Sequence, residues 1–515
     1  MQTTPRIVIV GAGMAALSAA LRLSPRPVLV ISPEPLGEGA SSAWAQGGVA
    51  AAMGAGDSAE DHAADTRRAG AGIVDPAVAD LVTRLARDHI LDLTAKGAPF
   101  DRDAQGNYVL SREAAHGRAR VVRVKGDQAG REIMATLIAA VRATPSVQVL
   151  EGVAAARLEV QAGRVVGVWL GRADGTSGLA LLRAPAVLLA AGGAAGLYAV
   201  TTNPARIRGQ AMGMAARAGA VIADAEFVQF HPTAIATGED PAPLATEALR
   251  GEGAVLINTQ GQRFMVALHP DAELAPRDVV ARAIFAQTQA GLRPMLDTRA
   301  CLGADILDRF PAVAGACLRA GIDPVRDAIP VAAAAHYHMG GVAVDHAGRA
   351  SLPGLWVCGE AASTGLHGGN RLASNGLLEA LVFARLAADS LAAATPEQPG
   401  SPAAPVQIAF PPGSQRLDDA AVAQLRRVMT EHVGVLRDGP GLRHALAEMD
   451  AIAAGATPSE ALTNMLTAAR LIAGAALLRQ ESRGGHCRTD YPGTDPAQAQ
   501  RSRLTLDQLP QPETA

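Results

Sequence analysis

The sequence predicts an α/β protein in which a discontinuous parallel-sheet domain carries an inserted α+β domain and a C-terminal helical bundle. Three observations predict this fold. The chain opens with the pattern of an apolar strand, a glycine turn and an apolar helix. The pattern of an apolar strand followed by glycine recurs near residue 352, after a more polar segment. The last hundred residues are rich in Ala, Leu and Arg at helical spacing. With 515 residues, the chain is long enough for two or three domains.

Composition excludes several classes of protein. Hydrophobic residues make up 49% and charged residues 18%, which is typical of a folded globular chain. The net charge of -3 argues against nucleic acid as a main partner. No apolar run is expected to span a membrane. The four cysteines are scattered without a CxxC pair, which favours a reducing cytoplasm and no metal site.

The first motif is a nucleotide-binding signal. In RIVIVGAGMAALSAALRL, Gly11 and Gly13 take the first two places of GxGxxG, and Ala16 takes the third. Such a turn brings the backbone and a helix N-terminus against a pyrophosphate. A purely structural glycine turn is the alternative, but the strand–turn–helix–strand context, which ends in PVLVIS at Ser32, favours a Rossmann-type nucleotide site. The glycine-rich segment around Gln46 is either a surface loop or a row of donors along the cofactor.

The domain boundaries are predicted where the composition and the expected secondary structure of the chain change. Short β-type runs between about residues 147 and 190 predict a small antiparallel sheet that returns to a buried strand. The segment that follows has more charge and reads as an inserted substrate domain. The boundaries we predict are 1–223 for the first part of the nucleotide domain, 224–338 for the capping domain, 339–395 for the second part, 396–415 for a Pro-rich linker and 416–515 for the helical domain, with a disordered tail.

Seven motifs carry a resemblance to a known family. They are GAGMAA, AWAQGGVAA, FVQFHPTA, TEALRGEGA, LAPRDVVARAI, AAHYHMGGV and TGLHGGNRLASNGLLEAL, and ESRGGHCRTDYP follows near the C-terminus. In this order and spacing the chain resembles the flavoprotein family of succinate dehydrogenase, fumarate reductase and L-aspartate oxidase over nearly its whole length. It is most similar to the L-aspartate oxidase branch. Ser41 stands where the respiratory members carry the His that binds FAD covalently, so the resemblance implies non-covalent FAD.

The resemblance implies an activity and partners. Members of this branch oxidise L-aspartate to iminoaspartate, with oxygen (giving hydrogen peroxide) or fumarate as acceptor, as the first step of de novo NAD biosynthesis. It further implies quinolinate synthase as functional partner, a cytoplasmic location and a monomer or homodimer. A soluble fumarate reductase or succinate-oxidising flavoprotein is the alternative enzyme, and a binding or assembly subunit without chemistry is the alternative from another class.

Substrate residues are expected from charge and from the resemblance. A site for small dicarboxylates needs cations and hydrogen-bond donors at both carboxylates. The resemblance assigns catalysis to Arg277, His231, His336 and Arg371, with Arg277 as proton donor or acceptor. It adds Thr246, Glu247 and Ser374 as substrate contacts. Glu113 matches the position that meets the substrate's ammonium, and a surface Glu paired with Arg112 or Arg118 is the alternative.

Cofactor residues are assigned in the same way. The expected contacts are Gly11, Ala12, Gly13, Met14, Ala15, Ser41, Ser42, Ala45, Gln46, Gly47, Gly48, Val153, Gly192, Glu360, Asn375, Gly376 and Leu377. We also expect Gly365, Gly368 and Gly369 to let the backbone approach the flavin. The chain departs from the family at Gly376, where a Ser is usual, and at Gln210, where an Asp is usual. Both departures predict a weaker hold on FAD.

Overall fold

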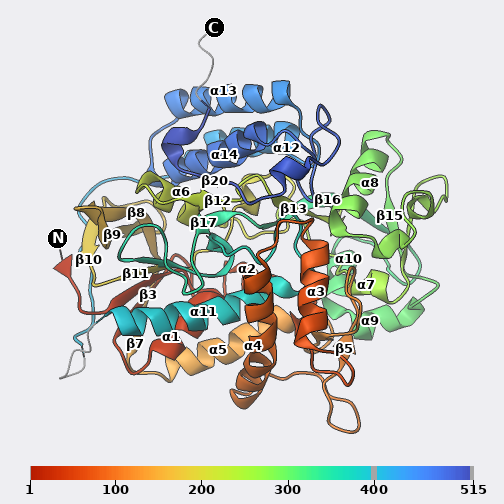
Figure 1. Ribbon diagram of the computed structural model, residues 1–515, viewed down its shortest axis with the longest axis horizontal. Coiled ribbons are helices and arrows are strands. Elements are labelled where there is room, and N and C mark those ends of the chain that lie inside the picture. Colours follow the sequence, from red (N-terminus) through yellow and green to blue (C-terminus); the bar gives the residue numbers. More distant parts are fainter. Residues whose placement is uncertain (1, 396–402, 511–515) are drawn as a thin grey trace.

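A computed structural model describes residues 2–395 and 403–510 of the chain. A parallel sheet of five strands lies at the centre of the molecule (Figure 1). Its order is β18-β11-β2-β3-β7. These strands are β2 (Ile7–Val10), β3 (Val28–Ser32), β7 (Val147–Glu151), β11 (Val187–Leu189) and β18 (Leu355–Val357). Because β18 pairs with β11 across more than a hundred intervening residues, the domain is discontinuous, as predicted.

The two faces of this sheet bury alternate residues, since successive side chains of a strand point to opposite sides. Ile7 and Ile9 face helices α1 (Met14–Leu23), α4 (Pro76–Ala95), α5 (Ala129–Arg142) and α11 (Asn375–Ala394). Val8 and Val10 face the second sheet and the C-terminal helices. Both faces are therefore covered, which explains why β2 and β3 are apolar throughout.

The second sheet has the order β1-β10-β9-β8. Its strands are β1 (Gln2–Thr3), β8 (Val153–Gln161), β9 (Arg164–Arg172) and β10 (Ala180–Arg183). β8, β9 and β10 pair antiparallel, as predicted. The expectation that this sheet begins at residue 147 is wrong, because β7 pairs parallel with β3 at the edge of the central sheet. A short β-type run has the same composition in either kind of pairing, so the sequence could not separate them.

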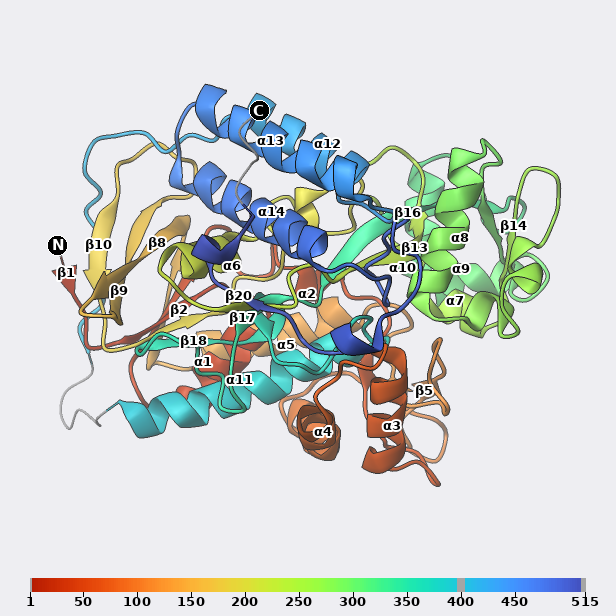
Figure 2. The same cartoon turned by 45° about the horizontal axis from the view of Figure 1, so that its top comes forward.

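The capping domain is a separate lobe beside the sheet domain (Figure 2). Its sheet has the order β13-β16-β15-β14, and one hydrophobic cluster spans Ile235 to Val331. The strands are β13 (Val228–Ile235), β14 (Val255–Ile257), β15 (Met295–Asp297) and β16 (Ile329–His338). The helices are α7 (Ala248–Gly251), α8 (Arg277–Gln289), α9 (Ile306–Arg309) and α10 (Pro311–Arg319). The boundaries 224–338 stay a prediction.

The C-terminal part begins with three helices and then becomes irregular. The helices are α12 (Asp419–His432), α13 (Gly439–Gly455) and α14 (Glu460–Leu478). After Leu478 the described chain is mostly turns and includes β20 (Arg503–Leu504), which pairs with β12 (Ile222–Ala223). The predicted C-terminal helical bundle is therefore confirmed, and an irregular segment follows it. Residues 396–402 of the predicted linker and 511–515 of the predicted tail lie outside the described residues.

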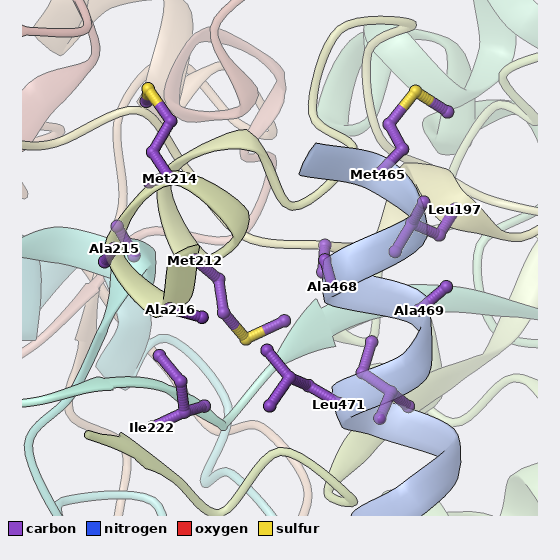
Figure 3. Packing of buried hydrophobic residues seen from close by; sticks show 14 of the residues in the cluster. Leu197, Met212, Met214, Ala215, Ala216, Ile222, Met465, Ala468, Ala469 and Leu471 are labelled. Carbon is purple, nitrogen blue, oxygen red and sulfur yellow. The ribbon is translucent and has the colours of Figure 1, made fainter. Parts of the chain in front are cut away.

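Helix α14 corrects the expectation that no apolar run could span a membrane. By length and composition it is apolar enough to do so. A stretch of 18 of its residues has a mean hydropathy of 1.5, and 72% of that stretch is buried. The helix packs against α6 (Gln210–Arg217), with Ala468 and Leu471 on the side of Met212 (Figure 3). This burial is typical of a core helix.

The remaining elements connect these parts. They are α2 (Ser41–Trp44), α3 (Ala59–Ala69), β4 (Val49–Ala50), β5 (Leu110–Ser111), β6 (Val121–Val122), β17 (Gly341–Ala343) and β19 (Ala362–Ser363). β4, β6 and β5 form one small sheet, and β19, β17, β12 and β20 form another.

Candidate active site

A cavity of about 1020 Å³ lies between the parallel sheet, the cap and α14. Residues that directly follow β2, β3 and β11 line it, so it opens at the carboxyl ends of the parallel strands, where α/β folds bind ligands. Its volume is at the top of the range of about 300–1,000 Å³ that is usual for ligand sites. The cavity is therefore large enough for a dinucleotide and a small substrate together.

The glycine turn after β2 forms one end of the cavity. Gly11 has φ +114°, and a Cβ there would strike the carbonyl of Ala190 on the neighbouring strand. Gly13 precedes α1 without a side-chain cap, and the Met14 N–H donates to Ser42 Oγ at 3.2 Å. Because the turn and the N-terminus of α1 both line the cavity, they fit a pyrophosphate.

The segment from Ser41 to Gly48 continues the cavity wall. The Oε1 atom of Gln46 is buried and has no hydrogen-bond partner among the described residues. Glu360 follows β18 and accepts a hydrogen bond from the His338 N–H at 2.9 Å, and burial raises the pKa of Glu360 to about 7. An orphaned acceptor and a half-buried carboxyl group at the cavity wall fit the polar edges of a flavin and its ribityl chain.

Sixteen of the seventeen expected cofactor residues line the cavity, and Asn375 does not. The Asn375 Oδ1 accepts from His62 Nε2 at 2.8 Å, and its Nδ2 donates to Thr66 Oγ1 at 3.0 Å. Its side chain thus ties the start of α11 to α3. Burial, followed by the neighbouring His116, lowers the pKa of His62 to about 3, so the ring is neutral in this network.

The structure also changes what we expect of Gln210 and of the three glycines Gly365, Gly368 and Gly369. Gly365, Gly368 and Gly369 lie outside the cavity lining. A Cβ at Gly368 would strike the Gly70 carbonyl, so these glycines let the loop approach the α3–α4 connection. Gln210 does line the cavity, but its amide donates to the Ala461 carbonyl at 3.0 Å and accepts from Asn464 at 3.1 Å. This side chain therefore joins α6 to α14.

All eight residues expected to bind substrate or act in catalysis also line the cavity. His231 on β13 and His336 on β16 come from adjacent antiparallel strands, and their rings lie 5.0 Å apart. The Thr233 N–H donates to His231 Nδ1 at 3.2 Å, so the neutral ring carries its proton on Nε2. Burial is the main cause that holds the pKa of both rings well below the usual value, followed by the arginine charges.

Arg277 is the first residue of α8 and lies in a buried polar chain. Its Nε donates to Glu247 Oε2, and its Nη1 donates to Gln229 Oε1 at 3.0 Å. Burial raises the pKa of Glu247, but the charges of Arg277 and Arg250 outweigh burial and lower it. Glu247 is therefore anionic and holds Arg277 at the cavity. Sequence reasoning missed Gln229, although its spacing of two from His231 on a strand is a signal for a shared face.

Glu113 is buried rather than exposed, with a relative accessibility of 2%. Ser374 Oγ donates to its Oε2 at 2.9 Å, and its Oε1 is buried with no partner in the described part of the chain. Neither Arg112 nor Arg118 pairs with it there, which removes the surface alternative. Burial, followed by the charge of Glu247, raises the pKa of Glu113. An open carboxylate oxygen in this place is suited to a cationic donor.

A buried clamp places Glu113. Arg120 donates to Asp57 at 2.9 and 3.0 Å and also to Asp65, which joins the loop after Glu113 to α3. His116 Nε2 donates to the Ala373 carbonyl at 3.0 Å, just before Ser374. Sequence reasoning did not identify this clamp, because its members are more than fifty residues apart.

The motif AHYH does not form a metal site in the structure. His338 Nε2 bonds the Ala225 carbonyl at 2.9 Å. Within residues 2–395 and 403–510, no group of three or more His, Cys, Asp and Glu residues is arranged to hold a metal ion.

Comparison with known proteins agrees with this geometry. A family model for an FAD binding domain matches residues 6–377, and one for the fumarate reductase flavoprotein C-terminus matches residues 457–511. The chain is 56% identical over 504 residues to an L-aspartate oxidase of Caulobacter vibrioides, covering 97% of this chain and 96% of that protein. It is 46% identical to an L-aspartate oxidase of Agrobacterium fabrum, covering 98% and 94%.

Solved structures share the fold of this chain over most of its length. A mutant FrdA of E. coli quinol fumarate reductase superposes with a TM-score of 0.84 at 27% identity, covering 97% of this chain and 94% of that chain. Sdh1 of Mycobacterium smegmatis gives a TM-score of 0.79 at 30% identity, covering 96% and 90%.

Proposed function

The chain belongs to the flavoprotein family of the L-aspartate oxidases and the fumarate reductase and succinate dehydrogenase flavoproteins, and we propose that it oxidises L-aspartate to iminoaspartate with FAD. It is an FAD-dependent oxidoreductase with an α/β fold. We propose that FAD is held without a covalent bond by the turn from Gly11 to Ala15, the segment from Ser41 to Gly48, and Glu360.

The observation that carries the substrate proposal is the charge pattern around the cavity. Arg277, Arg371 and two neutral histidines supply donors for two carboxylates. Glu113 supplies an unpartnered carboxylate oxygen in the same cavity. A dicarboxylate without an amine leaves that buried oxygen unpaired, whereas the ammonium of L-aspartate satisfies it. The site therefore complements an amino dicarboxylate better than succinate.

The residues act by binding and orienting the substrate. Arg371 and the Nε2–H of His231 hold carboxylate oxygens, and Glu247 keeps Arg277 at the cavity. When bound, FAD would supply the two-electron acceptor for the hydride that leaves Cα; the ammonium nitrogen first loses one proton to water, so hydride loss leaves the protonated imine. Glu113 holds the nitrogen, so the Cα–H bond has one orientation in the cavity.

The proposal extends to the electron acceptor, the partner enzyme, the location and the oligomeric state. We propose oxygen or fumarate as the electron acceptor, since the N–H donors that bind the carboxylates of L-aspartate also fit those of fumarate. The unstable imine product requires an enzyme that consumes it, for which we propose quinolinate synthase. We propose a cytoplasmic protein that is a monomer or homodimer.

A direct assay tests this function. The purified holoprotein, given L-aspartate in aerated buffer, is expected to form hydrogen peroxide, whereas D-aspartate and succinate form far less. Peroxide formation from succinate at a rate equal to that from L-aspartate would overturn the proposal in favour of a succinate-oxidising flavoprotein.

A further inference from the structure

Arg371 is buried but has almost nothing to hold it. It is 6% exposed, and its guanidinium makes no hydrogen bond or ion pair with any protein atom of residues 2–395 and 403–510. Burial is the main cause that lowers the pKa of Arg371 to about 10, and the charge of Arg277 lowers it further. A long side chain that binds a carboxylate from this position needs another means of orientation, because a free guanidinium samples many rotamers.

Tyr337 supplies a surface beneath the guanidinium. The Arg371 Cζ atom lies 4.4 Å from the centroid of the Tyr337 ring, which is the geometry of a cation–π contact. This contact leaves the edge of the guanidinium, with its N–H donors, free to face the cavity.

The Tyr337 ring is itself fixed from behind. Its hydroxyl donates to Glu379 Oε2 at 2.9 Å and lies 3.2 Å from His367 Nε2. His367 Nε2 in turn lies 2.8 Å from Glu379 Oε2, and Thr364 donates to Glu379 Oε1 at 2.5 Å. All four side chains are buried. The network leaves the ring little room to move.

Gly376 sets how close the ring lies to α11. A Cβ on Gly376 would be 2.9 Å from Tyr337 Cε2 and 3.3 Å from Arg371 Nη1. The first distance is shorter than side chains tolerate, so a larger residue would displace either the ring or the helix start. The glycine, which departs from the family's Ser, thus belongs to the substrate side of the site as well as to the cofactor side.

We propose that Tyr337 positions Arg371 for carboxylate binding and that Gly376 provides the space in which the ring does so. This inference rests on the proposed function, because it takes a dicarboxylate as the ligand of Arg371. Tyr337 acts through Arg371 and is a positioning residue.

The test measures binding rather than turnover. Fumarate is titrated calorimetrically into oxidised holoprotein, which has no reducing equivalents for the ligand to accept, and FAD content is measured by absorbance. We expect Tyr337→Leu to weaken fumarate binding by about 30-fold, the effect of a desolvated cation–π contact. Tyr337→Phe keeps the ring and is expected to bind within about threefold of the parent protein.

Gly376→Ala is expected to weaken fumarate binding by about tenfold while FAD content stays unchanged. Combined with Tyr337→Leu it should cause no additional loss, because both changes act on one contact. Gly455→Ala is the control, since a Cβ there has open space in α13.

Four results would overturn the inference. Tyr337→Leu could bind fumarate as the parent does, or Tyr337→Phe could lose as much affinity as Tyr337→Leu, which would assign the effect to the hydroxyl network. Gly376→Ala could lose FAD and keep fumarate affinity. If the parent protein binds no fumarate and forms no peroxide from L-aspartate, the proposed function fails together with the inference.

Discussion

Replacing Glu113 by Gln removes the charge that distinguishes L-aspartate from other dicarboxylates and keeps the shape of the side chain. The amide oxygen of Gln can still accept the hydrogen bond from Ser374. What is lost is a buried charge opposite the substrate's ammonium, and breaking such a pair costs about 3 kcal/mol or more. We therefore expect kcat/KM for L-aspartate to fall by roughly 150-fold.

Fumarate has no ammonium, so its reduction by the reduced enzyme should stay within about threefold. The pKa of Glu113 is raised by burial and by Glu247, so the acidic limb of the L-aspartate pH profile should lie above the ordinary carboxyl value of 4.5 and vanish in the variant. Glu431→Gln, on the exposed side of α12, is the control. Equal losses for L-aspartate and fumarate would refute the assignment of Glu113 to the ammonium.

Three further changes test other parts of the site. Arg371→Lys loses the planar fork and the contact with the Tyr337 ring, so the affinity of the oxidised holoprotein for fumarate should fall by about 30-fold in calorimetry, and an unchanged Kd would contradict this. Gly11→Ala meets the Ala190 carbonyl at φ +114°, so the variant should elute from gel filtration without FAD, and full retention would count against the assigned turn. The pKa of His116 is lowered, mainly by burial, to about 4 from 6.5, so the unfolded chain binds this proton first as the pH falls. Folding then loses about 2 kcal/mol between pH 7 and pH 5, and His116→Gln, whose amide can still donate to Ala373, should show a smaller fall in Tm over that range.

Local patterns were sufficient to predict the glycine turn at one end of the cavity. The turn from Gly11 to Met14 needs only its own strand and helix, and both are where the sequence predicts them. The paired strands that carry His231 and His336 were not predicted in detail, but the motifs around these histidines indicated a common site, and the structure brings them to 5.0 Å.

Long-range packing decided what the sequence could not show. The charged flanks of Glu113 suggest a surface position, and its burial depends on a clamp between Arg120 and acids of the segment before and within α3. Asn375 was assigned to the cofactor from its neighbours, but His62 and Thr66 engage its amide instead. Such contacts join residues from 55 to 313 positions apart in the sequence, and no local periodicity encodes them.

We propose that the bound cofactor takes electrons from an amino dicarboxylate. The most direct measurement mixes the oxidised holoprotein anaerobically with L-aspartate or succinate and follows the flavin absorbance. We predict that L-aspartate bleaches the flavin fully and rapidly, that succinate bleaches it far more slowly, and that fumarate restores the colour. Bleaching by succinate without bleaching by L-aspartate would contradict the assignment of the Glu113 side of the cavity to an ammonium.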